Sequence, residues 1–209
     1  MDKKEELEKL KKEMEEDESL PKYPGSTQLV FGEGNPNAEI YYLGEAPGAM
    51  EDMQGRPFVG QAGKLLDRLN AENGIKREDV YISNVVRYRP PNNRDPLPDE
   101  ITAFGEYVAR EIEIIKPKVI VTLGRFSMNK FLPGEFISRV HGRRRNVFLK
   151  GRDIMVIPMY HPAAALRNGA VMEQFREDFK AIPKVLEELK QKECQEEEEK
   201  NRPQQIDLI

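Results

Sequence analysis

AEIYYLGEAPG, residues 38–48, is the stretch that decides the fold of this chain. The apolar run over residues 38–43 indicates a buried strand, and the loop Gly44–Gly48 follows it directly. A similar pair occurs later, where an apolar run over residues 154–158 precedes the loop His161–Ala163. In a parallel α/β sheet, the carboxyl ends of the strands lie side by side, and ligands bind there. The two loops therefore predict one active site, which combines backbone N–H groups, an acid and a histidine.

Strands and helices alternate along the rest of the chain. Further strands are expected at residues 28–31, 79–86 and 119–123, and helices at residues 60–73, 99–116 and 125–131. A basic turn lies within residues 136–150, and the last helix is expected to begin near Ala170. This alternation predicts a parallel sheet with helices on both of its faces.

The composition limits the class of protein. With 209 residues, the chain can form one domain with a sizeable core. It has no apolar run as long as a membrane span and no N-terminal apolar segment that resembles a signal peptide. The single cysteine, Cys194, excludes a disulfide framework and a cysteine-rich metal site, and it favours a cytoplasmic location.

The charge is distributed unevenly along the chain. The net charge is −4, but residues 1–19 hold 5 lysines and 9 acidic residues, and residues 186–209 hold 4 basic and 8 acidic residues. The first segment is expected to be a charged arm or helix, and the second a charged tail. The domain between them, residues 20–185, has 24 basic and 20 acidic residues, and this balance permits DNA binding.

Six short motifs resemble, in the same order, those of the family 4 uracil-DNA glycosylases. They are Gly44–Gly48, Pro57–Gly60, Asn84–Val86, Arg89–Arg94, Leu123–Arg125 and His161–Arg167. The resemblance covers about residues 17–185 and implies a three-layer α/β/α fold with a central, mostly parallel four-stranded sheet. It also implies a monomeric DNA repair enzyme that excises uracil from DNA by hydrolysis of the N-glycosidic bond, leaving an abasic site.

The sequence leaves two other functions open. One is a non-catalytic module, either uracil- or DNA-binding or tethered to a sliding clamp, that keeps the fold without the chemistry. The other is a glycosylase for another deaminated base. The presence of Phe58, Asn84 and His161 argues against the first alternative.

Asn84 and Phe58 are the candidates for holding the base. Uracil offers an N3–H donor beside its O4 and O2 acceptors, and an amide side chain can bind N3–H and O4 together. The resemblance assigns this role to Asn84 and assigns to Phe58 the stacking on the flipped base. The competing interpretations are an asparagine that caps its strand and a phenylalanine of the core.

His161 is the candidate for stabilising the leaving group. Uracil departs as an anion, and the resemblance implies that His161 donates a hydrogen bond to uracil O2. A hydrogen-bond donor that already points at the developing charge contributes strongly to catalysis, and a neutral imidazole can act as this donor. The second histidine, His141, is assigned no catalytic role.

The loop that begins at Gly44 would contact the base and position the attacking water. The best-known uracil glycosylases have an aspartate at the position of Ala46, which can contribute only its backbone here. The general base is therefore left open between Glu45, Asp52 and water held by backbone carbonyls. Glu51 corresponds to a residue that lies against uracil C5 and excludes the methyl group of thymine; its competing interpretation is a solvated surface acid.

Other residues are candidates for contact with the DNA around the uracil. Leu166 could enter the space that the flipped base leaves, with Arg167 beside it. Arg143, Arg144 and Arg145 could bind phosphates, or they could form an ordinary solvated turn.

The chain departs from the family at one cofactor site. The family carries an iron–sulfur cluster on four cysteines, and the motifs place the corresponding positions at Asp17, Leu20, Tyr88 and Phe104. A cluster needs thiolates, so we expect no cofactor and no metal. We expect Leu20, Tyr88 and Phe104 to form a small apolar core instead.

The tail contains a candidate partner motif. Residues Gln205–Ile209 resemble the peptide by which repair proteins bind the bacterial sliding clamp, and they follow a charged segment. The alternative is an incidental sequence. The expected partners are thus uracil-containing DNA and a sliding clamp, and the expected location is the nucleoid within the cytoplasm.

Overall fold

Four parallel strands form the centre of the sheet in the computed structural model, which describes residues 2–200. They lie in the order β3 (Tyr81–Asn84), β2 (Ile40–Gly44), β4 (Val119–Leu123) and β6 (Arg152–Met159). All residues of β2, β3 and β4 are buried, as is usual for parallel strands that are covered on both faces. The predicted parallel centre of the sheet is confirmed.

An antiparallel strand is added at each edge, so the sheet has six strands rather than four. β1 (Glu33–Gly34) pairs with β3, and β5 (Arg145–Leu149) pairs with β6. The strand expected at residues 28–31 is wrong. The apolar side chains of Leu29, Val30 and Phe31 are buried in the core, although this segment forms no strand. Val30 N–H donates to the Arg87 carbonyl beyond the end of β3.

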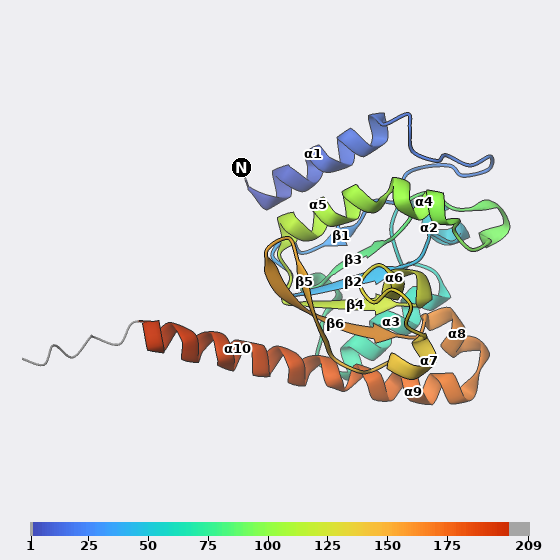
Figure 1. Cartoon of the computed structure of the whole chain (residues 1–209). Coiled ribbons are helices and arrows are strands. Elements are labelled where there is room, and N and C mark those ends of the chain that lie inside the picture. Colours follow the sequence, from blue (N-terminus) through green and yellow to red (C-terminus); the bar gives the residue numbers. More distant parts are fainter. Residues whose placement is uncertain (1, 201–209) are drawn as a thin grey trace, which may run out of the picture.

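Helices cover both faces of the sheet (Figure 1), which confirms the three-layer α/β/α architecture. One face packs against α1 (Lys3–Glu16), α4 (Pro98–Ala103) and α5 (Gly105–Ile115). The other face packs against α3 (Gln61–Glu72), α9 (Gly169–Phe179) and the first turns of α10 (Ala181–Lys200). Each face has its own hydrophobic core, and the sheet separates the two.

The helix expected at residues 99–116 is divided into α4 and α5. Phe104 ends the first helix and caps the second, with a ψ of −4°, and Gly105 follows it. The Phe104 side chain is fully buried at this junction. Periodicity did not reveal the break, because apolar residues continue at helical spacing on both sides of it.

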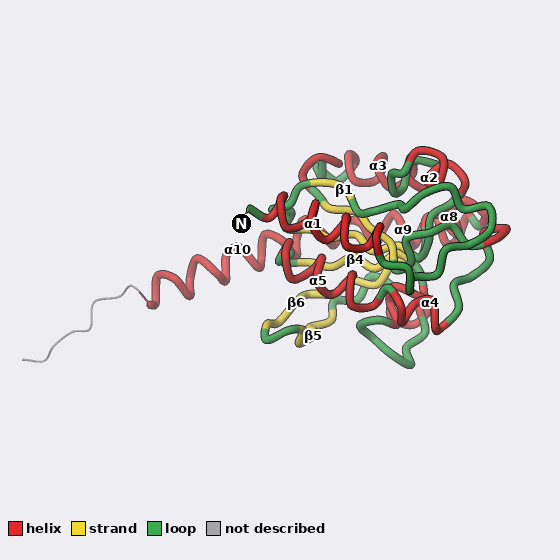
Figure 2. The backbone as a smooth tube through the Cα atoms, turned by 90° about the horizontal axis from the view of Figure 1, so that it is seen from above, coloured by secondary structure: helices red, strands yellow, loops and turns green. Residues whose placement is uncertain are grey.

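The two charged ends of the chain behave differently. α1 is part of the body: Leu7, Leu10 and Met14 are buried against the core, and Glu13 forms an ion pair of 2.6 Å with Arg110 of α5. α10 begins at Ala181, its next residue Ile182 is buried, and the helix then extends away from the body, as Figures 1 and 2 show. The candidate clamp peptide, residues 205–209, lies outside the described residues.

Short helices and turns follow the carboxyl ends of the strands and build one rim of the molecule. They are α2 (Ala49–Gln54) after β2, a 3₁₀ turn (Pro91–Asn93) after β3, α6 (Arg125–Asn129) after β4 and α8 (Pro162–Arg167) after β6. A second 3₁₀ turn (Arg77–Asp79) leads into β3, and α7 (Ile137–Val140) precedes β5. Within residues 2–200, no helix has the length and apolar character required for a membrane span.

Candidate active site

A cavity of about 470 Å³ opens at the carboxyl ends of the parallel strands. Its walls include Glu45, Phe58, Asn84 and His161, which come from four separate segments of the chain. Parallel pairing explains the convergence, because Gly44 at the end of β2 lies opposite Asn84 at the end of β3. The site predicted from the two loops is therefore a single cavity of a size typical for small-molecule sites.

Asn84 presents an unused hydrogen-bonding group to this cavity. The residue is 1% exposed, and its Oδ1 atom has no hydrogen-bond partner among the described residues. Such a buried, unpaired polar atom costs about 1–3 kcal/mol of stability. The interpretation of Asn84 as a strand cap does not hold, because its side-chain oxygen caps nothing within residues 2–200.

Phe58 forms the wall beside Asn84 in a strained conformation. Its φ is +52°, a left-handed value that costs a non-glycine residue energy. Glu51 holds the following segment, since its Oε1 accepts hydrogen bonds from Val59 N–H at 2.9 Å and Gly60 N–H at 2.8 Å. Phe58 belongs to the core and also lines the cavity, so the core interpretation is confirmed and the stacking on a base stays a prediction.

Gly44 is required where Phe58 and Asn84 meet. A β-carbon at this position would come within 2.5 Å of Phe58 Cζ and closer still to Asn84 Oδ1. Any side chain would therefore displace both groups from the cavity wall.

His161 lies against Phe58 and caps α8. The two ring centroids are 5.9 Å apart, with planes inclined by 35°. Ala163 N–H donates to His161 Nδ1 at 3.2 Å, so a neutral ring carries its proton on Nε2. Burial, with the charge of Arg167 as a smaller cause, lowers the pKa of His161 to about 4. Near neutral pH, His161 is therefore an uncharged hydrogen-bond donor.

Glu45 is one of three carboxylates in the cavity lining, with Glu51 and Asp95. Burial raises its pKa to about 7, against the opposing effect of the Phe126 and Arg125 backbone N–H groups at the start of α6. Gly124 allows this approach, because a β-carbon there would overlap the Glu45 carboxylate. A carboxyl group that titrates near neutral pH is suited to accept a proton.

Asp52 is not part of the cavity, which corrects its candidacy as the general base. Its Oδ1 accepts hydrogen bonds from Ser26 Oγ at 3.2 Å and from Thr27 N–H at 2.9 Å. Successive residues on a helix point about 100° apart, so α2 directs Glu51 to the cavity wall and Asp52 toward residues 26–28. Glu51 itself is buried, so it is not a solvated surface acid.

Three arginines line the mouth of the cavity, namely Arg94, Arg125 and Arg167. Arg94 forms an ion pair of 2.5 Å with Glu100, and Arg125 pairs with Asp95. Sequence reasoning assigned no role to Arg94 or Arg125, although both lie in recognised motifs. Ala46 lies in the wall, and Leu166 follows on α8 with 47% of its surface exposed.

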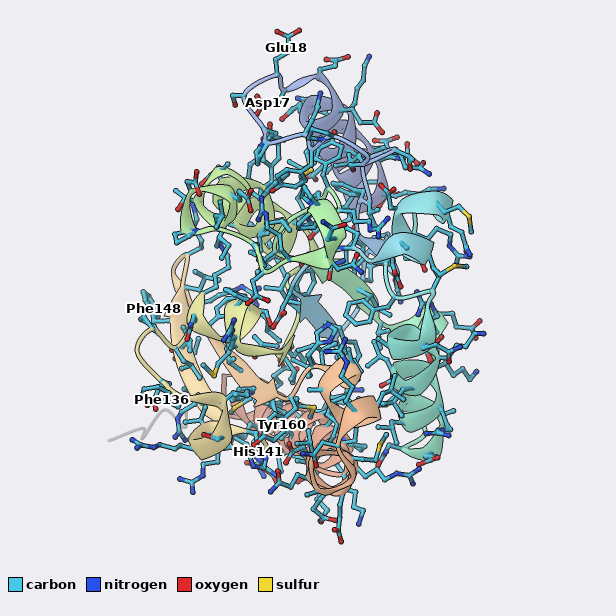
Figure 3. All side chains as sticks on the ribbon, turned by 90° about the vertical axis from the view of Figure 1, so that its right-hand side faces the viewer. Asp17, Glu18, Phe136, His141, Phe148 and Tyr160 are labelled. Carbon is cyan, nitrogen blue, oxygen red and sulfur yellow. The ribbon has the colours of Figure 1, made fainter. Side chains whose placement is uncertain are left out.

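The turn Arg143–Arg145 does not reach the cavity. Arg144 pairs with Glu188 of α10, and Arg145 donates to the Arg144 carbonyl at 3.2 Å. Tyr160, by contrast, lines the cavity and was missed, although its place next to His161 could have indicated it. His141 lies against Tyr160 (Figure 3), with the ring centroids 4.7 Å apart and the planes inclined by 39°. His141 Nδ1 also forms a hydrogen bond of 2.9 Å with Asp178 Oδ2.

The positions that correspond to cluster ligands do not fit an iron–sulfur cluster. Leu20, Tyr88 and Phe104 are buried in the same core, with the two rings 6.3 Å apart. The Asp17 carboxylate accepts hydrogen bonds from Tyr107 Oη at 2.7 Å and from Ser19 N–H at 2.9 Å. These four side chains offer no thiolate, and three of them are buried apolar or aromatic groups.

Comparison with known proteins adds independent findings. The family model described as the uracil DNA glycosylase superfamily matches residues 31–190. The type-4 uracil-DNA glycosylase of Archaeoglobus fulgidus is 50% identical over 161 residues, which cover 75% of this chain and 81% of the relative. That of Sulfurisphaera tokodaii is 48% identical over 183 residues, 84% of this chain and 83% of the relative. That of Saccharolobus solfataricus is 49% identical over 163 residues, 75% and 76% of the two chains.

Proposed function

The chain belongs to the uracil-DNA glycosylase superfamily, and we infer that it is a DNA repair hydrolase that excises uracil from DNA. One observation in the cavity supports this inference chemically. A buried amide with an unused oxygen, an aromatic ring and a neutral imidazole donor line the same cavity. This set matches the hydrogen-bonding edge, the flat face and the departing charge of a pyrimidine base.

In this proposal, the flipped uracil lies between Phe58 and the loop that begins at Gly44. Asn84 Oδ1 accepts the uracil N3–H, and Asn84 Nδ2 donates to O4. Cytosine has an unprotonated N3 and an amino group in place of O4, so with the amide in this orientation it would leave both Asn84 groups unpaired. Glu51 fixes the Phe58 segment from behind, which keeps the ring in its strained position before the base arrives.

The C1′–N1 bond then breaks, and its electron pair goes to uracil N1. The negative charge spreads to O2, where His161 Nε2–H donates a hydrogen bond to it. Water attacks C1′ of the cation-like sugar and transfers a proton to the Glu45 carboxylate. Glu45 then gives this proton up through solvent to the uracil anion, so the products are neutral uracil and an abasic site. A donor that is already in place, such as His161, needs no reorganisation as the charge develops.

The direct test is excision from a labelled oligonucleotide with one uracil, followed by alkali. We expect cleavage at the uracil and none in matched oligonucleotides with thymine or cytosine. Asn84→Ala should reduce kcat/KM about 10- to 100-fold, because it removes hydrogen bonds to the base. A wild-type protein that binds the oligonucleotide without cleavage would instead be a non-catalytic module. A panel with deaminated purines tests the remaining alternative.

We propose that the enzyme works without an iron–sulfur cluster. Leu20, Tyr88 and Phe104 support this, because all three are buried in one hydrophobic core, with the two rings 6.3 Å apart, and none of them supplies a thiolate. Iron analysis and a visible spectrum of anaerobically purified, active protein test the proposal. Stoichiometric iron with absorbance near about 400 nm would contradict it, given the thiolate requirement of such clusters.

For DNA contact, we propose that Leu166 enters the gap left by the uracil and that Arg167 stabilises the adjacent backbone. Both follow His161 on α8, and Leu166 is exposed. Arg143, Arg144 and Arg145 are proposed to make weaker phosphate contacts, because Arg144 is already paired with Glu188. Their replacement should reduce the salt dependence of binding more than kcat.

We further propose that residues 205–209 tether the enzyme to a sliding clamp and that the enzyme acts as a monomer at the intracellular nucleoid. α10 supports the tether, because it leads away from the body on the side opposite α8 (Figure 1). A peptide carried there would leave the cavity open to DNA. Clamp capture by the full chain, compared with a chain lacking residues 205–209, is the test, and equal capture would contradict the tether.

A further inference from the structure

Phe136 is an exposed aromatic residue beside the cavity that the excision chemistry does not use. It caps the start of α7, and 63% of its surface is exposed. The next residue, Ile137, lines the cavity. Figure 3 shows Phe136 toward the same lower end of the molecule as Tyr160 and His141, while Asp17 and Glu18 lie at the opposite end.

Several contacts hold Phe136 in place. Its carbonyl accepts a hydrogen bond from Arg139 N–H at 2.9 Å, and Val140 of the same helix is buried. Gly142 N–H donates to the Pro158 carbonyl at 2.8 Å, which attaches the end of α7 to β6. The Phe136 backbone is thus attached to β6, the strand that leads to His161.

The segment that begins at Phe136 is basic in sequence, and Arg139 is the cation at the ring. Residues 136–152 contain six arginines and lysines and no acidic residue. The Arg139 guanidinium lies 5.2 Å from the Phe136 ring centroid, and Arg139 and Arg143 are exposed. Exposed aromatic rings interleaved with cations are the pattern by which proteins bind single-stranded nucleic acids, since the rings stack on bases and the cations bind phosphates.

We propose that Phe136 stacks on an unpaired nucleobase next to the flipped uridine, with Arg139 at the adjoining phosphate. This inference rests on the proposed excision of uracil from DNA. In a duplex, the neighbouring bases are stacked and paired, so their faces are not available to Phe136. In a single strand, they are free. The enzyme should therefore favour uracil in single-stranded DNA, and Phe136 is the specificity-determining residue for that preference.

The chain provides a matched control for the test. Phe148 is 71% exposed and lies in the same basic segment, but it pairs with Asp153, far along β6 from the cavity. Phe136→Ala, Phe136→Trp and Phe148→Ala are compared with wild type on single-stranded and duplex oligonucleotides of the same sequence. Circular dichroism verifies that each variant is folded.

We expect Phe136→Ala to raise KM on single-stranded DNA about tenfold, equivalent to about 1.4 kcal/mol at 25 °C, with kcat unchanged. KM on duplex DNA should change less than twofold, and Phe136→Trp should restore the single-strand value. An unchanged KM in Phe136→Ala, or an equal loss in Phe148→Ala, would overturn the inference. If wild type excises no uracil, the proposed function fails, and equilibrium binding of a uracil-containing single strand still tests Phe136.

Discussion

Ser83 and Asn84 are neighbours on β3, but their side chains enter opposite regions of the molecule. Ser83 faces a buried network on the α5 side of the sheet, and Asn84 faces the cavity. In the network, Arg87 and Glu111 form an ion pair of 2.7 Å with both side chains 0% exposed. The hydroxyls of Tyr41 and Tyr81 donate to Glu111, and Arg87 donates to Ser83 Oγ. In the cavity, Asn84 Oδ1 has no partner among the described residues.

The difference shows how one strand serves both stability and function. Buried polar atoms stabilise a fold when they satisfy one another, and most atoms of the Arg87 network do so. A buried polar atom without a partner is a cost that a ligand can remove on binding. We therefore expect changes in the network to affect stability and changes in the cavity to affect activity.

The largest expected effect is on the network. Glu111→Ala leaves the Arg87 charge buried without its partner, so the free energy of unfolding should fall by about 3–5 kcal/mol. The double variant Arg87→Met, Glu111→Leu should lose much less, because neither charge remains. Urea unfolding at neutral pH measures both changes. A loss of under about 1 kcal/mol for Glu111→Ala would show that the buried pair contributes little, contrary to the expected 3–5 kcal/mol.

The next effect is the loss of His161. His161→Ala should reduce kcat about 100- to 1000-fold, equivalent to about 2.7–4 kcal/mol, because it removes a preorganised donor at the departing charge. The measurement is single-turnover excision. Stability at pH 7.5 should fall by only about 0.5–2 kcal/mol, the cost of losing the α8 cap, which is less than the loss expected for Glu111→Ala.

His161 should also affect stability in acid. Its pKa is about 4 in the folded chain and about 6.5 in the unfolded chain, so the unfolded chain binds more protons between these values. Wild type should therefore lose stability as pH falls from about 6.5 to about 4. His161→Ala should lack this part of the loss, and urea unfolding at pH 7.5 and pH 5 gives the comparison. Equal acid sensitivity in the two proteins would mean that His161 is not a buried neutral ring.

Glu45 gives a third effect, on the pH profile. Its pKa of about 7 predicts that kcat declines as pH falls below 7, since a protonated carboxyl cannot accept a proton. Glu45→Gln should lower kcat about 100-fold and remove that decline. It should also raise stability at pH 8, because the folded chain then no longer buries a charge that the unfolded chain solvates. A wild-type profile that is flat from pH 5 to pH 8 would exclude Glu45 as the base.

The sequence predicted the centre of the sheet and the convergence of Glu45, Phe58, Asn84 and His161. Both succeed for a physical reason: buried parallel strands have continuous apolar runs, and their carboxyl ends must meet. Side-chain direction was harder to predict. Asp52 is adjacent to Glu51 on α2 and yet binds Ser26 and Thr27, because one step along a helix turns the side chain away from the cavity.

Contacts between residues far apart in the chain could also not be predicted from the sequence. The apolar run at residues 28–31 is buried without forming a strand, and only tertiary packing distinguishes these outcomes. The partner of Arg144, Glu188, is 44 residues away. Phe136 carries no motif, so only the folded chain places it beside the cavity, next to Ile137 in the cavity wall.

The smallest expected effect is a difference in stability between variants of Ser83 and Asn84, and it tests the comparison of these two β3 residues directly. Ser83→Ala removes an acceptor from the buried Arg87 and should cost about 1–3 kcal/mol of stability. Asn84→Ala removes an oxygen that has no partner among the described residues, so its cost should stay below about 1 kcal/mol, and water can enter from the cavity. Urea unfolding of the two variants measures this difference between adjacent residues. If Asn84→Ala proved the more destabilising, Asn84 would be a structural residue, and its unpaired oxygen would no longer argue for a ligand.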